Sequence, residues 1–312
     1  MKFKLFDKNI IKKKHKDFNH LNGNRLLNYY LSRENPELIA WYMRKLFFHN
    51  NKYYPNFDKP ESFNEKIHWL KLNYHNSLIT KCCDKFKVKE YSREVLGKDI
   101  CVPTIASWTN VNNINFDKLP NKFVLKVNWS SGYNIIVKDK TTLNINEIKH
   151  RINQWMQPYN NSYYVNFNWG YKDMKPVIYA EEYLDELDKD LPDYKFLCYN
   201  GEPKNLFVVS NRFKKMKVDF FDMDWNHLPF KRKHPTSKNP PKKPENFEQM
   251  VEIARKLSKP FPFVRVDIYS VKNKLYIGEL TFVPGGGLEP FTPVEWDYKF
   301  GKMLTLPNQK EI

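Results

Sequence analysis

The stretch VRVDIYSVKNKLYIGELTFV, residues 264–283, is the most informative part of the sequence. Two runs rich in β-branched and aromatic residues flank a short polar segment, which is the pattern of a β-hairpin. Alternate residues along a strand share one face of the sheet. Arg265 and Asp267 therefore share a face of the first strand, and Glu279 and Thr281 share a face of the second. The apolar residues between them are expected to point to the core.

The register of this hairpin decides whether its polar residues meet. In an antiparallel pair the residue numbers of opposite residues have a constant sum. Asp267 lies opposite Glu279, and Arg265 opposite Thr281, only if that sum is even. That register needs a connection of odd length, so we expect residues 272–274 (KNK) to form a three-residue loop. A two-residue loop would place the two acids on opposite faces, because a shift of one residue reverses every side chain.

Carboxylates that lie side by side repel each other, and a divalent hard cation is their usual partner. Asp267 and Glu279 are therefore candidate ligands of such a cation. Arg265 beside them would hold a phosphoryl or acyl-phosphate oxygen. The alternative interpretation is a solvated sheet face with an ion pair between Asp267 and Arg265.

An earlier hairpin carries a second candidate anion site. FVLKVN, residues 123–128, and NIIVKD, residues 134–139, are expected strands, with the turn WSSGY between them. Lys126 and the small residues of the turn can hold phosphates through side-chain charge and backbone N–H groups. The segment is not a P-loop, because the G-x-x-x-x-G-K-[ST] pattern is absent. A solvent-facing lysine is the alternative.

Two further expected strands carry charged residues. VIYAEEYL, residues 177–184, contains Glu181 near its end, and the backbone edge there could bind adenine with an acid near the exocyclic amine or the ribose. The sequence DYK places Lys195 at the start of the next strand. A charged strand end is the alternative in both places.

The remaining patterns predict a mixed α+β chain. Strand, turn, strand, helix and strand follow one another over residues 123–184, which is typical of an α+β subdomain. Residues 231–244, KRKHPTSKNPPKKP, are expected to be loop. Apolar spacing and caps predict helices over residues 36–48, 63–72, 84–96, 145–156 and 245–258.

Composition limits the class of protein. The chain has 312 residues, 41% of them apolar and 28% charged, so it is not mainly disordered and about two domains are expected. No apolar run approaches the ~18 residues of a membrane span. The N-terminal MKFKLFDKNIIKKKHK lacks the apolar region of a signal peptide. Four cysteines without a C-x-x-C favour a reduced, cytoplasmic chain.

The charge of the chain is strongly positive. Lys and Arg number 52 against 35 Asp and Glu, which gives a formal charge of +17. Such a surface attracts nucleic acid, an anionic membrane face, nucleotides or an acidic polymer. Composition alone does not choose among these partners.

The order of these parts resembles the ATP-grasp superfamily: strand lysine, small-residue loop, Glu-Glu strand end, lysine, Arg-x-Asp, Glu-x-Thr. More specifically, the chain resembles the TupA-like ATP-grasp proteins of bacterial surface-polysaccharide gene clusters, over about residues 57–306. The resemblance is carried by FNEKIHWLKL (63–72), DK (84–85), LPNKFVLKVNWSSGYNIIV (119–137), VIYAEEYL (177–184), DYKFLCYNGEPK (193–204), SNRF (210–213) and the block at 242–301 that contains GELTFVPGGGLEPFTPVEWDYKFG.

The resemblance implies an ATP-grasp fold in which two α+β subdomains grip the nucleotide, preceded by a helical N-terminal extension. It divides the chain into a basic tail with N-terminal helices (1–56), a pre-ATP-grasp region (57–118), a lid subdomain (119–185), a C-terminal subdomain with the metal site (186–306) and a tail (307–312).

The resemblance also implies nucleotide contacts. The Lys85 and Lys126 side chains look like the two lysines that bind the phosphates, and Glu181 looks like the adenine-side acid. The full set of implied nucleotide contacts is Lys85, Lys126, Ser130, Ser131, Gly132, Glu181, Tyr183, Leu184 and Lys195.

The same resemblance implies the catalytic and metal residues. Asp267 and Glu279 look like the magnesium ligands, and Arg265 and Lys195 look like catalytic residues, with Arg265 stabilising the phosphoryl group. Thr281 stands where these enzymes often have Asn, and its hydroxyl is a third candidate ligand.

A function follows from the resemblance. It implies an ATP-dependent carboxylate–amine ligase that works through an acylphosphate, with ATP and Mg²⁺ as cofactors. Expected partners are an acidic surface glycan or its precursor and an amine or amino-acid nucleophile, and no nucleic acid. The candidate acceptor-binding surface consists of the loop at 231–243 and the basic residues Arg212, Lys214, Lys215 and Lys217. The N-terminal helices are candidates for a peripheral contact with the inner membrane face.

Three alternatives remain open. A glycosyltransferase is suggested by Asp222-Met223-Asp224, a D-x-D that could bind a metal and a nucleotide sugar. A glycan kinase on the same ATP-grasp fold would carry the same phosphate machinery. An RNA-binding module is suggested by the charge, although no ribonucleoprotein aromatic motif, KH loop or zinc-knuckle spacing is present.

Overall fold

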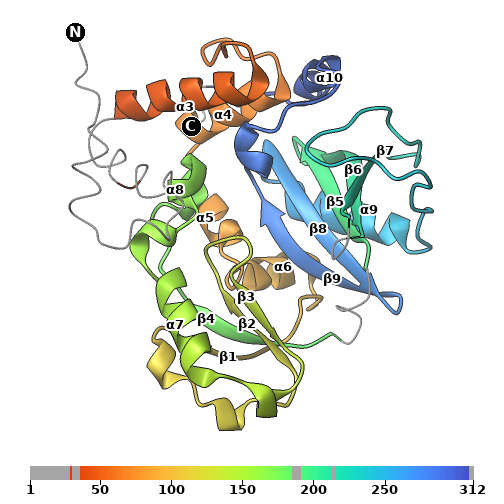
Figure 1. The fold of residues 1–312 in the computed structure, drawn as a ribbon. Helices are drawn as coiled ribbons and strands as arrows, with labels where there is room; N and C mark the ends of the chain where they lie inside the picture. Colours follow the sequence, from red (N-terminus) through yellow and green to blue (C-terminus); the bar gives the residue numbers. More distant parts are fainter. Residues whose placement is uncertain (1–28, 30–35, 185–190, 212–214, 309–312) are drawn as a thin grey trace.

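The computed structural model describes Tyr29 and residues 36–184, 191–211 and 215–308. The basic tail and the candidate acceptor residues Arg212 and Lys214 lie outside the described residues. Figure 1 shows two sheets with helices packed around them. No helix in the described ranges combines the length and the apolar character that a membrane crossing needs.

The helices in chain order are α3 (Pro36–Asn51), α4 (Phe63–Asn73), α5 (Ser77–Cys83), α6 (Val88–Leu96), α7 (Ile145–Trp155), α8 (Tyr163–Asn166), α9 (Phe247–Ser258) and α10 (Glu295–Met303). The strands are β1 (Thr104–Trp108), β2 (Phe123–Val127), β3 (Asn134–Val137), β4 (Ile178–Glu182), β5 (Asp193–Tyr199), β6 (Glu202–Ser210), β7 (Lys217–Asp222), β8 (Phe263–Val271) and β9 (Lys274–Thr281).

The strands form two antiparallel sheets. The smaller sheet has the order β1-β4-β2-β3, and the larger has the order β7-β6-β5-β8-β9. Helix α7 packs on the smaller sheet (Figure 1), where Ile148 and Ile152 join the buried cluster of Phe123, Leu125 and Ile178. Separate antiparallel sheets with packed helices confirm the predicted α+β class.

Helix α9 covers one face of the larger sheet (Figure 1). Met250, Ala254 and Leu257 of this helix are fully buried in one apolar cluster with Phe196 and Val266 of the sheet. These helix positions recur at spacings of three and four residues, which places them on one stripe. The helix expected over residues 245–258 is therefore confirmed.

Helices α4 and α10 cover only part of the opposite face of the larger sheet. Phe63 of α4 packs edge-on against Tyr199 and Phe263, and Phe300 of α10 packs edge-on against Tyr199. The rest of this face carries Arg265 and the other candidate site residues, and it faces the smaller sheet across a cavity.

Helix α4 begins where its capping residues predict. The Ser62 hydroxyl accepts a hydrogen bond from Glu65 N at 3.2 Å, and the Glu65 carboxylate accepts one from Ser62 N at 3.0 Å. This reciprocal arrangement satisfies two N–H groups that a helix start otherwise leaves unpaired. The helix expected over residues 63–72 is confirmed.

The helix expected over residues 84–96 begins later than predicted, at Val88. Asp84 ends the preceding helix, and its carboxylate accepts hydrogen bonds from the N–H groups of Phe86 at 2.8 Å and Lys87 at 3.1 Å. The aspartate therefore builds a turn between α5 and α6. Aspartate competes for backbone donors in this way at many turns.

The decisive hairpin has the predicted register around its polar residues. Asp267 pairs with Glu279, and Arg265 pairs with Thr281. These four side chains therefore lie on one face of the larger sheet, as the alternation of the sequence predicts.

The predicted three-residue loop of this hairpin is wrong. Val271 pairs with Lys274, so the turn has two residues, Lys272 and Asn273, with φ of 50° and 62°. Positive φ at both positions is the geometry of a tight hairpin turn that follows the twist of the strands. A bulge at Gly278 adds one residue to β9 between the turn and the acids, and this extra residue restores the register.

Candidate active site

A cavity of about 480 Å³ lies between the two sheets and beside α6. The smaller sheet, the β2–β3 loop and α6 form one wall, and β5, β8 and β9 form the other. Of the predicted site residues, those that line this cavity are Lys85, Lys126, Ser130, Ser131, Gly132, Glu181, Lys195, Arg265, Asp267 and Glu279.

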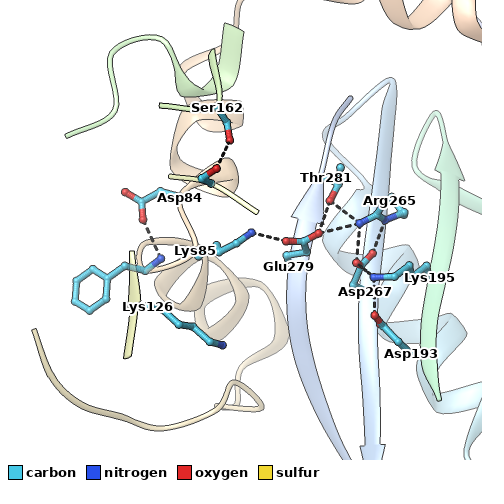
Figure 2. Close-up of polar contacts among 12 residues, drawn as sticks. Asp84, Lys85, Lys126, Ser162, Asp193, Lys195, Arg265, Asp267, Glu279 and Thr281 are labelled. Atoms are coloured by element: carbon cyan, nitrogen blue, oxygen red, sulfur yellow. Dashed lines mark hydrogen bonds and ion pairs between the residues drawn. The ribbon is translucent and has the colours of Figure 1, made fainter. Parts of the chain in front are cut away.

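Arg265 is the centre of the polar cluster on the larger sheet (Figure 2). Its Nε donates to Asp267 Oδ1 at 2.6 Å, and its Nη2 donates to Asp267 Oδ2 and Glu279 Oε1, both at 2.8 Å. Nη2 also donates to the Thr281 hydroxyl at 3.0 Å, and that hydroxyl donates to Glu279 Oε1. The planar guanidinium is suited to such multiple contacts with carboxylates.

Lysines complete the cluster from two directions. Lys195 on β5 pairs with Asp267, and also with Asp193 Oδ2 at 2.7 Å. Lys85, which comes from the turn before α6, crosses the cavity and pairs with Glu279 (Figure 2). The Lys85–Glu279 pair therefore joins the two walls of the cavity.

The two acids differ in their ease of ionisation. Burial disfavours the charged form of Glu279, but Lys85 and Arg265 outweigh burial and hold its pKa well below the ordinary value. Burial raises the pKa of Asp267, against the effect of Arg265 and Lys195, and the charge of Glu279 adds to that rise. Burial and the neighbouring carboxylate thus oppose the charge of Asp267, whereas the cations stabilise the charge of Glu279.

Glu181 organises the wall that belongs to the smaller sheet. The whole residue is only 4% exposed. Its carboxylate pairs with Lys126 of β2 and, at 2.5 Å, with Lys89 of α6. Burial opposes ionisation of Glu181, but the two lysines outweigh it and lower the pKa. The role of Glu181 beside adenine stays a prediction, whereas the structure contains its ion pairs with Lys89 and Lys126.

Asn128 fixes the position of the turn that carries Lys85. Its Nδ2 donates to Asp84 Oδ2 at 2.8 Å, and its backbone carbonyl accepts from Lys85 N at 3.3 Å. The following loop is anchored by a hydrogen bond of 3.1 Å between the hydroxyls of Ser130 and Ser162. Polar links between neighbouring segments thus place Lys85 and the small-residue loop at one end of the cavity.

Several predicted residues lie away from the cavity lining. Tyr183 and Leu184 follow β4 and are half-buried, and Lys215 is exposed. Thr281 contacts the cluster through Glu279 and Arg265. Tyr183, Leu184 and Lys215 are not part of the cavity lining. The nucleotide contacts predicted for the first two and the acceptor contact predicted for Lys215 therefore stay predictions.

The D-x-D sequence at 222–224 is part of a tight turn. The Asp222 carboxylate accepts hydrogen bonds from Asp224 N at 3.0 Å, Asn226 N at 2.8 Å and Asn226 Nδ2 at 2.9 Å. This use of Asp222 is structural, since an aspartate that accepts from the next N–H groups is a common turn device.

Sequence reasoning missed the charged cavity residues Lys89 and Asp193. Asp193 lies two residues before Lys195, so strand alternation could have indicated it, whereas Lys89 lies on α6 and Lys85 lies in the turn before that helix. Their functions became visible only through their partners, because Lys89 reaches Glu181 of another element.

The acids fit a magnesium ion that is bound together with a nucleotide. Within the described ranges, no group of three or more His, Cys, Asp or Glu side chains is arranged for a metal ion. Mg²⁺ usually takes only one or two carboxylates and completes its shell with phosphate oxygens and water. Asp267 and Glu279, with the Thr281 hydroxyl, supply donors of the required oxygen type.

Comparison with solved structures returns ligases and a synthetase at low identity. The D-alanine–D-alanine ligase of Bacillus anthracis aligns at 20% identity and TM-score 0.41, over 66% of this chain and 58% of that chain. The D-alanine–D-alanine ligase of Helicobacter pylori aligns at 14% identity and TM-score 0.41, over 73% of this chain and 60% of that chain.

The ADP complex of N5-carboxyaminoimidazole ribonucleotide synthetase aligns at 11% identity and TM-score 0.42, over 80% of this chain and 56% of that chain. The present chain therefore spans less than two thirds of the length of these structures. No curated protein sequence matches it significantly.

The family comparison is more extensive. A family model described as TupA-like ATPgrasp matches residues 65–305, which is most of the chain. The matched region begins within α4, ends after α10 and includes every predicted residue that lines the cavity. By this match, the chain belongs to the TupA-like ATP-grasp family.

Proposed function

We propose that this protein is an ATP-dependent ligase that joins a carboxylate to an amine through an acylphosphate. The observation that supports this most is the pairing of two walls across one cavity. Lys85, Lys126 and the loop at 130–132 offer cations and backbone donors, which suit nucleotide phosphates. Arg265 and Asp267 face them from the larger sheet and suit the phosphoryl group that is transferred.

The proposed reaction has two steps. A carboxylate oxygen attacks the terminal phosphorus of ATP and ADP leaves, which gives an acylphosphate. A neutral amine then attacks the acyl carbon, the bond from that carbon to the phosphate oxygen breaks, inorganic phosphate leaves, and the nitrogen loses a proton to give the amide. Both steps bring charged groups together, so positioning and electrostatic stabilisation are the main tasks of the protein.

The residues of this chain divide these tasks between the two walls. Lys85 and Lys126 hold phosphate oxygens, and Arg265 neutralises charge on the group in transfer. Asp267 and Glu279 would hold Mg²⁺, which when bound offsets the charge of the phosphates. In the structure the lysines pair with acids, Lys85 with Glu279 and Lys126 with Glu181. We expect nucleotide phosphates to take over these lysines.

The finer proposal is amidation of an acidic surface polysaccharide or its precursor in the cytoplasm. Its support is the formal charge of +17 and the basic loop at 231–243 beside the larger sheet. Neutralising Lys215 and Lys233 should weaken acceptor use and leave ATP binding intact. A glycan kinase would share the ATP site, whereas the turn role of Asp222 leaves a glycosyltransferase with less support.

A peripheral contact with the inner membrane face belongs to the same proposal. Trp41 is 53% exposed and Tyr54 is 64% exposed, and the Lys45 ammonium lies 5.7 Å and 5.8 Å from their ring centroids. Exposed aromatic rings next to cations suit the interface of an anionic bilayer. Co-sedimentation with phosphatidylglycerol vesicles should fall when Trp41 and Tyr54 are changed to serine, and equal sedimentation would contradict the contact.

Thermal-shift titration tests the proposed function. Mg-ATP should raise the unfolding temperature, because a ligand that binds only the native state stabilises it by mass action. The shift should disappear in the double variant Asp267→Asn, Glu279→Gln and weaken in Lys126→Met. Lys122→Met is the matched control, since this lysine precedes β2, is exposed and lies outside the cavity lining.

Two results would contradict the proposal. A shift with UDP-sugars alone, sensitive to Asp222→Asn and indifferent to the double variant, would support the glycosyltransferase. ADP release that needs a glycan hydroxyl but no carboxylate or amine would support the kinase.

A further inference from the structure

A second cavity, of about 160 Å³, adjoins the first one. The two spaces share the lining residues Lys195, Val209, Met216, His234 and Arg265. The second cavity therefore begins at the proposed reaction centre and extends away from it over β6 and β7.

The face of the larger sheet changes character along one row of cross-strand neighbours. The pairings place Glu279, Asp267, Lys195, Phe207 and Phe220 side by side across the five strands. Opposite residues in antiparallel strands share a face and have neighbouring Cβ atoms. The acids and the lysine are thus followed directly by an apolar surface, and the Arg265 guanidinium lies 5.7 Å from the Phe207 ring centroid.

The floor of the second cavity is apolar. It is lined by Phe207 and Val209 of β6, by Met216, and by Val218 and Phe220 of β7. Alternate residues of each strand provide this lining, so they form one continuous surface. A ligand part that lies here gains from apolar contact and finds few partners for hydroxyl groups.

The far end of the second cavity carries a buried cation, Arg232. Its side chain is 7% exposed, and its guanidinium lies 4.5 Å from the Phe291 ring centroid. Nη2 donates to the Glu289 carbonyl at 2.9 Å and to Asn64 Oδ1 at 3.4 Å. The Glu289 side chain also lines this cavity, and its Oε2 lies 3.9 Å from Nη2.

The Nε of Arg232 has no hydrogen-bond partner in the described part of the chain. Buried donors in native proteins are nearly always paired, by protein, water or ligand. Arg232 lines the cavity, and its Glu289 partner lies 3.9 Å away, so the guanidinium can still pair with an anionic ligand group.

We infer that the second cavity binds the nucleophile as an α-amino acid with an apolar side chain. This inference rests on the proposed ligase function. The carboxylate pairs with Arg232, the side chain lies on Phe207, Met216 and Phe220, and the amino group points to the end formed by Lys195 and Arg265. A 150 Å³ cavity accepts a ligand of about the size of benzene, so the second cavity has room for one small side chain.

The reaction of this nucleophile balances without a further reagent. The ammonium first loses a proton to solvent. The amine nitrogen then bonds to the acyl carbon of the acylphosphate, the bond from that carbon to the phosphate oxygen breaks, and the nitrogen loses its second proton. The products are an amide that carries the free carboxylate of the amino acid, and inorganic phosphate.

Thermal shift with a series of matched compounds tests the inference on the full chain. L-leucine, D-leucine, glycine, isoamylamine, 4-methylpentanoate and D-glucuronate are titrated in the presence of Mg²⁺ and a non-hydrolysable ATP analogue. Isoamylamine lacks the carboxylate of leucine, and glycine lacks its side chain. We expect one enantiomer of leucine to bind at least tenfold more tightly than isoamylamine and at least tenfold more tightly than glycine.

Variants identify the site. Arg232→Gln should weaken leucine binding at least tenfold, and Met216→Gln should weaken it severalfold. Arg255→Gln is the matched control, because this exposed arginine lies on α9, on the other face of the sheet. Isoamylamine should be indifferent to Arg232→Gln. Should Arg232→Gln prevent folding, the ligand series and Met216→Gln still decide the question.

The outcomes separate the inference from the proposed function. Failure to bind the ATP analogue contradicts the ligase proposal itself. Binding of the analogue with no preference for leucine over glycine and isoamylamine, or with tighter binding of glucuronate, overturns the inference alone. Leucine binding that is unchanged in both cavity variants overturns it as well.

Discussion

Gly278 determines, at the scale of one residue, that two acids share a face of the sheet. The two-residue turn alone would place Asp267 and Glu279 on opposite faces, and the bulge at Gly278 corrects this. A Cβ atom at position 278 would lie 2.6 Å from Tyr269 Cε2 and 3.2 Å from Tyr269 Cζ. Glycine therefore allows the Tyr269 ring to pack over the bulge.

Gly278→Ala should destabilise the fold and weaken Mg-ATP binding. We expect a loss of about 1–3 kcal/mol in the free energy of unfolding, the usual cost of overpacking. Urea unfolding measures the loss. The double variant Gly278→Ala, Tyr269→Ser removes the clashing ring and should recover part of it. Equal stability of Gly278→Ala and the parent would show that the ring can move aside freely.

Lys71 supplies a pH dependence of stability. Burial lowers its pKa to about 7 from an ordinary 10.5, and its Nζ donates to the Gly286 carbonyl at 3.2 Å. Between these two pKa values the unfolded chain binds more protons than the native chain. The contribution of Lys71 to the free energy of unfolding should therefore rise with pH across this interval.

Urea unfolding at pH 7 and pH 9 measures this effect of Lys71. Each pH unit in the interval contributes at most about 1.4 kcal/mol, so Lys71 adds a rise of about 2 kcal/mol to the pH profile. Buried thiols such as Cys82 and Cys198, whose pKa burial raises, contribute in the opposite direction. Lys71→Met should remove the rise and be more stable than the parent near pH 7. Lys302→Met, an exposed control, should keep the rise. A Lys71→Met profile parallel to that of the parent would contradict the prediction.

At the scale of elements, α4 and α10 are held together by close backbone approach. A Cβ atom on Gly301 of α10 would lie 2.0 Å from the Glu61 carbonyl oxygen and 2.9 Å from Phe63 N. The start of α4 also bonds to α10, because Asn64 N donates to Asp297 Oδ1 at 2.9 Å. These contacts orient the helix pair that covers one end of the larger sheet.

Gly301→Ala tests this packing. Alanine favours a helix over glycine by about 1 kcal/mol, but here the new methyl group meets rigid backbone and the helices must separate. We expect a net loss of at least about 2 kcal/mol, measured by denaturant unfolding. Lys302→Ala, exposed on the same helix, should stay within about 0.5 kcal/mol of the parent. A stabilising Gly301→Ala would show that α10 is not seated this closely.

At the scale of the whole molecule, the cavity joins two sheets that come from distant parts of the chain. The Lys85–Glu279 pair joins the two walls of this cavity, and the loop at 130–132 lines it. Hydrogen exchange can therefore report whether the loop closes on a nucleotide. Backbone N–H groups that donate to phosphates should exchange more slowly.

With Mg²⁺ and a non-hydrolysable ATP analogue, amides of residues 130–133 should exchange severalfold more slowly. Amides on the exposed face of α9, across the sheet from the cavity, should change little. The double variant Asp267→Asn, Glu279→Gln is the control and should show no protection of the loop. Protection spread evenly over both regions would point to general stabilisation instead of loop closure.

The sequence by itself determined those features that depend on local patterns. Alternation along the strands placed Arg265 with Asp267 and Glu279 with Thr281, and apolar spacing predicted most of the helices. The family resemblance, now confirmed by the match over residues 65–305, also selected the residues that line the cavity. The strand and helix features follow from the periods of these elements, which each segment carries in its own residues. The cavity residues, by contrast, were implied by the resemblance.

Only the tertiary structure decided how distant segments complete the site. The bulge at Gly278 sets the register. A glycine within a strand is compatible with a bulge, but it does not by itself exclude a longer turn. Lys89 acquires its partner Glu181, and Arg232 its place at the end of an apolar cavity, through packing of elements far apart in the chain. The sequence gives the residue type and therefore the ordinary charge of each side chain. The burial of that side chain and its partners depend on the packing of the whole chain.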